Sequence, residues 1–222
     1  MDKVFVLIPA FNEESSISKV VKDLKKNGYN NILVVDDGSS DNTTAVAEKA
    51  GAEVLTHIIN RGQGAALQTG MSYLKDKASV VVHFDADGQH DPKQIPRFLK
   101  EIKNYDVVLG SRFLDKTTKM PLSKKILLKG AVWVSWAMTG LKLSDTHNGF
   151  RALNNKALRK IKLKQDDMGH ATEILDEIKI NKLKYKEVPV TIKYTSYSMS
   201  KGQSVFNSLK ILYHNFHHKF IK

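Results

Sequence analysis

Residues 80–89 read Val80-Val81-Val82-His83-Phe84-Asp85-Ala86-Asp87-Gly88-Gln89, a short apolar run that passes directly into two aspartates. A run of this kind is typical of a strand that is buried on both faces of a sheet. Two carboxylates at the end of such a strand can share a divalent cation with a diphosphate, because Mg²⁺ and Mn²⁺ prefer oxygen ligands. The alternative is structural: the aspartates cap a helix that begins near Pro92.

The rest of the first half alternates short apolar runs with helical patterns. The runs predict strands at residues 4–8, 32–35, 54–55, 80–84 and 106–109. Between them apolar residues recur at helical spacing, and Gly28 and Gly51 are suited to end two of the helices. The alternation predicts an α/β fold with a mostly parallel central sheet that is covered by helices on both faces.

The second half is less regular. Residues 123–141 and 171–181 predict helices, and residues 150–153 predict a short strand. The alternation within residues 183–194 slips by one position, which indicates a bulge near Glu187 or a strand at the edge of the sheet.

Polar loops follow three of the predicted strands, at residues 9–14, 36–41 and 85–91. In open α/β sheets ligands bind at the carboxyl ends of the strands, so these loops are expected to converge on one crevice. Asp36 or Asp37 can accept hydrogen bonds from a ribose or a base there. The convergence predicts a nucleotide-type ligand.

Two common phosphate-binding motifs are absent. The first strand is followed by Pro9-Ala10-Phe11-Asn12-Glu13-Glu14 rather than by Gly-x-Gly-x-x-Gly, which disfavours a dehydrogenase. Gly62-Gln63-Gly64 lacks the Lys-Ser/Thr ending of a P-loop. Its backbone N–H groups, with Arg61 beside them, can approach a phosphate, or the glycines can simply start a helix.

Composition narrows the classes of partner. The chain has 222 residues, no cysteine and a formal net charge of +12, so disulfides and thiolate metal sites are excluded and an anionic partner is expected. The most apolar stretch, residues 130–141, is shorter than the roughly 20 residues that a bilayer-spanning helix needs. We therefore expect a cytoplasmic protein with no transmembrane segment.

Five motifs in order resemble family 2 glycosyltransferases, which have the Rossmann-like GT-A fold, and within them the dolichyl- and polyprenyl-phosphate sugar synthases. The motifs are Ile8-Pro9-Ala10-Phe11-Asn12-Glu13-Glu14, Val34-Val35-Asp36-Asp37-Gly38-Ser39-Ser40-Asp41, Asn60-Arg61-Gly62-Gln63-Gly64, Phe84-Asp85-Ala86-Asp87-Gly88-Gln89-His90 and Gly110-Ser111-Arg112-Phe113. Asp145-Thr146-His147-Asn148-Gly149-Phe150-Arg151 and Lys201-Gly202-Gln203 also resemble blocks of the family. The resemblance spans residues 4–203, so we expect a GT-A domain at residues 1–205.

The resemblance implies a metal-dependent, inverting hexosyltransferase of the cell envelope that uses a GDP- or UDP-sugar. Asp87 and Gln89 would hold Mg²⁺ or Mn²⁺, with Asp87 also counted as catalytic. The nucleotide-diphosphate sugar would be bound by Pro9, Ala10, Phe11, Glu13, Asp36, Asp37, Arg61, Gly64, Asp85 and Ala86. Asp85 would contact the ribose or the sugar.

The acceptor stays open between a polyprenyl phosphate and a saccharide hydroxyl. A lipid phosphate is already an anion and needs positive guides, whereas a hydroxyl needs a general base. The candidate guides are Arg112, Lys125, Lys129, Arg151 and Lys201. The candidate catalytic bases are Asp145 and Glu173. The resemblance implies that Arg112, also counted as catalytic, faces the acceptor phosphate or the donor diphosphate. The alternatives are a solvated helix-start carboxylate for Glu173 and an ion pair with Asp145 for Arg151.

Residues 206–222 combine apolar side chains with lysine and histidine, which predicts a basic amphipathic helix. Such a helix can lie on an anionic membrane surface or pack on the domain. Related enzymes often continue into transmembrane helices, so we expect either peripheral action or a separate membrane-protein partner. A nucleic-acid-binding module is the alternative from another class. It leaves Asp36, Asp37, Asp85 and Asp87 unexplained, since aspartates repel phosphates when no cation is present.

Overall fold

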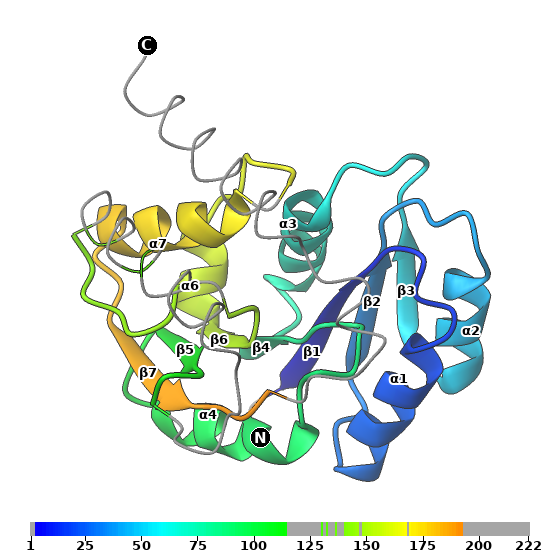
Figure 1. The fold of residues 1–222 in the computed structure, drawn as a ribbon, viewed down its shortest axis with the longest axis horizontal. Coiled ribbons are helices and arrows are strands. Elements are labelled where there is room, and N and C mark those ends of the chain that lie inside the picture. Colours follow the sequence, from blue (N-terminus) through cyan, green and yellow to red (C-terminus); the bar gives the residue numbers. More distant parts are fainter. Residues whose placement is uncertain are drawn as a thin grey trace.

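The computed structural model describes residues 3–114, 140–146, 148–167 and 169–192, together with Gly130, Val132 and Trp136. A 7-stranded sheet runs through the middle of the molecule in the order β3-β2-β1-β4-β6-β5-β7 (Figure 1). Its strands are β1 (Val4–Ala10), β2 (Ile32–Asp36), β3 (Glu53–Thr56), β4 (Val80–His83), β5 (Val107–Ser111), β6 (Arg151–Asn154) and β7 (Tyr185–Pro189).

Helices cover both faces of this sheet (Figure 1). They are α1 (Ile17–Lys26), α2 (Thr43–Ala50), α3 (Gln63–Leu74), α4 (Ile95–Glu101), α6 (Asn155–Lys160) and α7 (His170–Ile180), with a short 3₁₀ turn η1 (Pro92–Gln94) before α4. In β1, Val6 and Ile8 pack with α1 and α4, while Phe5 and Leu7 pack with α3 and α7 on the other face. Both faces of the strand are therefore buried, which explains its unbroken apolar run and confirms the predicted α/β class.

The sheet is mostly parallel, as predicted, but β6 runs antiparallel to both of its neighbours, β4 and β5. The predicted edge strand is confirmed, because β7 pairs with β5 at the end of the sheet. Its register is regular from Tyr185 opposite Val107 to Pro189 opposite Ser111, so the alternative of a bulge near Glu187 is wrong. Pro189 is tolerated there because an edge strand leaves one side of its backbone unpaired.

One edge of the sheet collects the functional loops. The parallel strands β1, β2, β4 and β5 all end at this edge, so the segments after Ala10, Asp36, His83 and Ser111 lie there together. Because β6 is reversed, it begins at the same edge and brings residues 148–150 to it. We refer to this side of the molecule as the carboxyl edge.

Two helices predicted from the sequence lie wholly or mostly outside the residues that the structure describes. The predicted helix at residues 206–222 lies outside the described residues, as does most of the one at 123–141, of which Gly130, Val132 and Trp136 are helical. Across the part of the chain that the structure does describe, none of the helices has the length and apolar character needed to cross a membrane.

Candidate functional site

The two aspartates after β4 stand at the carboxyl edge with their backbone fixed by core packing. Phe84 and Ala86 point into the core, so the alternating Asp85 and Asp87 face away from it and stay partly exposed. Oδ1 of Asp87 accepts a hydrogen bond from the backbone N–H of Gln89 at 2.9 Å. Gly88 makes this return possible, because its φ of 75° is one that side-chain-bearing residues rarely adopt. The loop thus presents Asp87 and Gln89 together.

Asp87 sits in a negative environment. Burial and the neighbouring Asp85 raise the pKa of Asp87 from 3.8 to about 6, and Glu13 adds to the effect. Among the described residues no group of three or more His, Asp or Glu side chains is arranged to hold a metal ion. A two-donor protein site still suits Mg²⁺, which usually binds one or two carboxylates and completes its shell with water and substrate phosphates. The repulsion at Asp87 is one that a divalent cation would relieve, so these residues fit a metal.

Asp85 is held differently. Oδ2 of Asp85 lies 2.8 Å from Nε2 of the buried His90. Burial alone would raise the pKa of Asp85, but His90 and the buried Arg151 hold it below its ordinary value. Asp85 therefore stays ionised next to an Asp87 that resists ionisation. The two carboxylates have separate electrostatic roles.

Gly149 makes room for Asp85. A Cβ atom on Gly149 would lie 2.7 Å and 2.9 Å from the two carboxylate oxygens of Asp85. Contacts this short force the carboxylate to move, since the backbone of residues 148–150 is held by the bond from Phe150 N–H to Asn148 Oδ1 at 2.9 Å. Gly149 is part of the block quoted from the sequence, but its role needed the structure.

We expect Gly149→Ala to lower catalytic turnover about 10- to 100-fold while the protein remains folded, because a displacement of about 1 Å at a reacting centre has effects of that size. Steady-state kinetics measure the turnover of the variant, and circular dichroism measures whether it is folded. Gly130→Ala is the matched control, since a Cβ there meets no atom within 4 Å. Equal activity of the two variants would show that the carboxylate position of Asp85 does not matter.

Aromatic and histidine side chains pack beneath the loop that carries Asp85 and Asp87, on the side of the core. The ring of Phe150 packs against Phe84 and His90, with centroids 5.3 Å and 4.7 Å away, and stacks on Phe98 at 4.3 Å. His83 is buried in the same region, where burial and Arg151 lower its pKa to about 3, so it is neutral. Within the described residues, both ring nitrogens of His83 and Nδ1 of His90 have no hydrogen-bond partner, whereas Nε2 of His90 faces Asp85. The sequence motif included His90 but did not predict this buried support.

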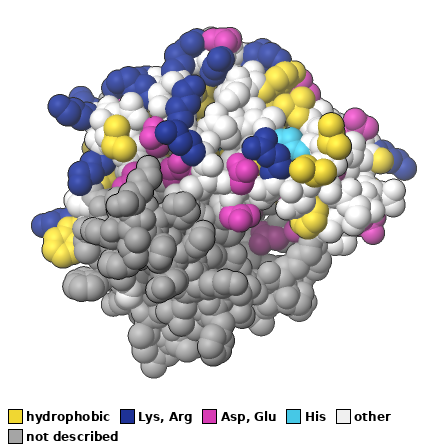
Figure 2. Space-filling view, turned by 90° about the horizontal axis from the view of Figure 1, so that it is seen from above, with side chains coloured by type: hydrophobic (Ala, Val, Ile, Leu, Met, Phe, Trp, Pro, Cys, Tyr) yellow, Lys and Arg dark blue, Asp and Glu magenta, His cyan; other side chains and the backbone are white. Residues whose placement is uncertain are grey.

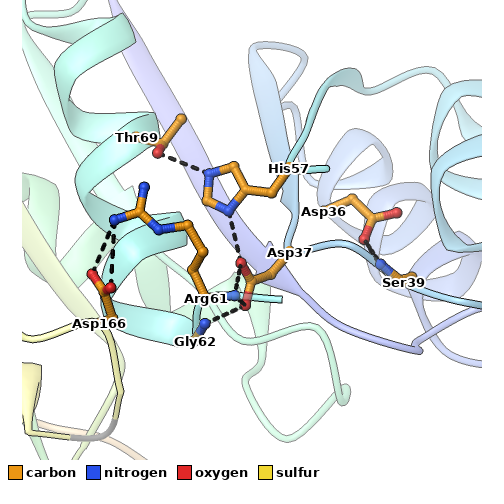
Figure 3. A network of polar contacts seen from close by, with 8 residues as sticks. All are labelled: Asp36, Asp37, Ser39, His57, Arg61, Gly62, Thr69 and Asp166. Atoms are coloured by element: carbon orange, nitrogen blue, oxygen red, sulfur yellow. Dashed lines mark hydrogen bonds and ion pairs between the residues drawn. The ribbon is translucent and has the colours of Figure 1, made fainter. Parts of the chain in front are cut away.

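The carboxylates of Asp36 and Asp37 accept hydrogen bonds from neighbouring residues of the chain (Figure 3). Oδ1 of Asp36 accepts hydrogen bonds from the backbone and hydroxyl of Ser39, and Oδ2 accepts one from Thr44 Oγ1. Asp37, which is 2% exposed, accepts from the backbone N–H groups of Arg61 and Gly62 and contacts His57 Nδ1 at 2.7 Å. Both carboxylates were predicted to hold a ribose or a base. Asp36 thus ties the loop after β2 to the first turn of α2, and Asp37 ties that loop to the one after β3. Their contact with a ribose or a base stays a prediction.

The glycine-rich segment after β3 starts a helix. The N–H groups of Gly64 and Ala65 donate to the carbonyl oxygen of Asp166, at 2.7 Å and 3.2 Å. A Cβ on Gly64 would lie 2.0 Å from the carbonyl oxygen of Gln165, so the close approach requires glycine. The Arg61 side chain contacts the Asp166 carboxylate at 3.4 Å. The helix-start interpretation therefore accounts for Gly64, and its amide is not presented to a phosphate.

Arg112 and Asp145 form a buried ion pair at the end of β5. Nε and Nη2 of Arg112 donate to the two oxygens of Asp145 at 2.6 Å and 2.7 Å, and the Arg112 backbone N–H donates to Asp145 at 3.1 Å. The predicted partner of Asp145, Arg151, is not paired with it as closely: burial lowers the pKa of Arg151 to about 10, against the opposing charges of Asp85 and Asp145. Because both oxygens of Asp145 bind Arg112, its carboxylate is not placed as a general base.

Glu173 also differs from prediction. Its carboxylate accepts hydrogen bonds from the backbone N–H groups of Lys164 and Gln165, at 2.9 Å to 3.0 Å. It is neither a general base nor a solvated helix-start carboxylate, since it ties the loop before α7 to the first turn of that helix.

The other residues predicted to bind the nucleotide sugar differ in how exposed they are. Pro9, Ala10 and Ala86 are buried in the sheet and its loop, Glu13 is 8% exposed and Phe11 is 44% exposed at the carboxyl edge. Acidic side chains gather beside a hollow on the face seen from above, with lysines and arginines spread around them (Figure 2). Lys125, Lys129 and Lys201 lie outside the described residues.

Comparisons with known proteins identify relatives of this chain. Residues 5–162 match the family described as Glycosyl transferase family 2. An uncharacterized protein of Methanocaldococcus jannaschii is 44% identical, over 96% of this chain and 90% of its own. A UDP-N-acetylglucosamine–dolichyl-phosphate N-acetylglucosaminyltransferase of Methanococcus voltae is 34% identical, over 95% and 93%. Glucosyl-3-phosphoglycerate synthase from Mycobacterium tuberculosis, solved with Mn²⁺ and UDP-glucose, has a TM-score of 0.73 at 17% identity, over 96% and 79%.

Proposed function

This chain belongs to glycosyl transferase family 2, and on that basis we propose that it moves a hexose-type sugar from a nucleotide-diphosphate sugar to a polyprenyl phosphate. The chain is a glycosyltransferase enzyme. The relative from Methanococcus voltae, which is named for a dolichyl-phosphate acceptor, supports a lipid phosphate.

The choice of acceptor depends on whether a candidate carboxylate is available to act as a general base. A saccharide hydroxyl must lose a proton to attack, so it needs a carboxylate that is available to take it. Both carboxylates that the sequence offered for this task are engaged, Asp145 by Arg112 and Glu173 by the backbone at residues 164–165. A phosphate monoester is already an anion near neutral pH, and it needs a cationic guide such as Arg112 rather than a base. The engaged carboxylates therefore favour the phosphate acceptor.

The proposed reaction distributes tasks among the residues of the carboxyl edge. A phosphate oxygen of the acceptor attacks the anomeric carbon from the face opposite the leaving group. A new C–O bond forms, and the bond to the nucleoside diphosphate breaks with its electron pair on the diphosphate. Asp87 and Gln89 would hold the divalent cation, Mg²⁺ or Mn²⁺, which when bound neutralises charge on the leaving diphosphate. Asp85 orients the ribose or sugar, and Phe11 and Glu13 line the nucleoside.

We further propose that the enzyme works at the cytoplasmic face of the membrane, where a polyprenyl phosphate would present its head group. An excess of positive charge, +12 for the chain, favours approach to an anionic lipid surface.

A panel of nucleotide sugars tests the donor. We expect either UDP- or GDP-sugars, together with Mg²⁺ or Mn²⁺, to raise the melting temperature, because a ligand at about 100 times its Kd stabilises the folded state by roughly 2.7 kcal/mol. Differential scanning fluorimetry with and without EDTA measures the shift. A panel in which no nucleotide sugar gives a metal-dependent shift would contradict the proposed donor class.

The acceptor is tested separately with radiolabelled donor. Transfer should occur to a short polyprenyl phosphate and not to the matching polyprenol, which differs only in the phosphate. Transfer to a saccharide with none to the lipid phosphate would overturn the proposal.

A further inference from the structure

Glu187 lies on the edge strand β7, outside the motifs of the family resemblance, and its carboxylate has an organised set of partners. Oε1 accepts hydrogen bonds from the backbone N–H of Ser144 at 2.9 Å, from Ser144 Oγ at 2.8 Å and from the backbone N–H of Asp145 at 3.1 Å. Oε2 also accepts from Ser144 N–H, at 2.9 Å. One side chain thus fixes the backbone on both sides of the Ser144–Asp145 peptide link.

The next contact leads to the end of β5. Ser144 Oγ lies 2.6 Å from Ser111 Oγ, which ties the same segment to the residue before Arg112. Asp145 then binds Arg112 through three hydrogen bonds, two from the guanidinium and one from the backbone N–H. Glu187, the Ser144–Asp145 segment and Arg112 therefore form a continuous relay across three separate parts of the sheet edge.

Because the Arg112–Asp145 pair is buried, we expect its geometry to depend on Glu187. The side chains of Arg112 and Asp145 are only 10% and 1% exposed, so neither group can be resolvated in place if the pair shifts. The orientation of Asp145 depends on a backbone whose N–H groups point at Glu187. Without that carboxylate, the backbone N–H groups of Ser144 and Asp145 lose their hydrogen-bond acceptor. We expect the segment to shift so that these groups can bond to water.

We propose that Glu187 is a positioning residue that sets the orientation of Arg112 through Asp145, and so tunes binding of the acceptor phosphate. The inference rests on the proposed function in one respect, which is that Arg112 guides that phosphate. The effect of Glu187 on Arg112 is transmitted by the backbone of Ser144 and Asp145.

Kinetics of Glu187→Ala test the proposal. We expect the acceptor KM to rise about 10- to 100-fold, as for a misplaced binding group, while the donor KM and the donor-induced thermal shift stay within about twofold of wild type. Glu187→Gln keeps one oxygen for the Ser144 N–H and should give an intermediate acceptor KM. It also keeps the test valid if the alanine variant does not fold.

Glu173→Ala is the matched control. Glu173 likewise caps two backbone N–H groups of a loop, but that loop leads to α7 and not to Arg112. It should lower stability by an amount similar to Glu187→Ala without a selective change in acceptor KM. An equal rise of acceptor KM in the control would show that general loosening, not positioning, is responsible.

A second measurement does not depend on the acceptor. The Arg112 Nε–H resonance in ¹⁵N NMR spectra, assigned by its loss in Arg112→Lys, should be protected from exchange in wild type and in Glu173→Ala, and exchange faster in Glu187→Ala. Unchanged protection in a folded Glu187 variant would overturn the positioning role. If the resonance responds but wild type transfers nothing to polyprenyl phosphate, the proposed function fails while the relay stands.

Discussion

Asp87→Asn is expected to lower sugar transfer by about 10²- to 10³-fold and at the same time to stabilise the metal-free protein. The first effect follows from the loss of a charged oxygen ligand at the point where the leaving diphosphate must be neutralised. The second follows from the burial of Asp87 and from repulsion by the neighbouring carboxylates of Asp85 and Glu13. A substitution that removes function while adding stability is a specific signature of a binding site.

The pH dependence of the second effect has a defined sign. Burial, with a further contribution from Asp85, raises the pKa of Asp87 from 3.8 to about 6 in the folded protein. The folded state therefore holds this proton more tightly than the unfolded chain. That preference stabilises the protein fully at low pH and is lost as the pH rises from about 4 to above 6, by on the order of 1–3 kcal/mol. Asparagine does not ionise, so the variant should not show this loss.

Urea unfolding in EDTA at about pH 4 and about pH 8 measures the difference. Asp23→Asn is the control, because Asp23 is a surface carboxylate paired with Lys19 in an exposed helix turn. Two results would contradict the assignment. One is full transfer by Asp87→Asn with chelator present, and the other is an identical pH dependence of stability in the variant and wild type.

Asp145→Ala is expected to reduce the free energy of unfolding by about 3–5 kcal/mol, because it leaves the Arg112 guanidinium buried and unpaired by its carboxylate. This is a large part of the roughly 5–15 kcal/mol that a typical domain has in total. The pair is bidentate, with Arg112 Nε 2.6 Å from Asp145 Oδ2.

The chain contains a close match for comparison. Arg159 and Asp76 also form an Arg–Asp pair at 2.6 Å, but their side chains are 53% and 64% exposed, against 10% and 1% for Arg112 and Asp145. Asp76→Ala should lower stability by less than about 1 kcal/mol, since water replaces the lost partner. The two variants differ mainly in burial, so their difference measures what burial contributes.

Chemical denaturation of both variants provides the numbers. A similar small loss in both would show that the Arg112–Asp145 pair is easily resolvated. An Asp145→Ala protein that keeps wild-type stability and loses only turnover would instead support the original interpretation of Asp145 as a general base.

Much of the architecture could be predicted from the chain itself. The apolar runs of β1, β2, β4 and β5 appear in the sequence because a strand covered on both faces needs apolar side chains at nearly every position. Strand–helix alternation then implies parallel strands and a shared carboxyl edge, which placed Glu13, Asp85 and Asp87 on one side of the molecule. The reversed β6 was not predictable in this way, since four residues carry no sign of their direction.

The assignment of the carboxylates depended on tertiary structure. Asp36, Asp37, Asp85, Asp87, Asp145 and Glu173 are chemically similar, and the sequence predicted a ligand-binding or catalytic role for each of them. Their partners lie far along the chain, as with Asp145 and Arg112, 33 residues apart, and Asp37 and Gly62, 25 apart. Local sequence determines which residues are apolar and which helices and strands they form. Only the packed sheet decides which carboxylate is enclosed by donors and which stays available, because hydrogen bonds and burial depend on distances in space.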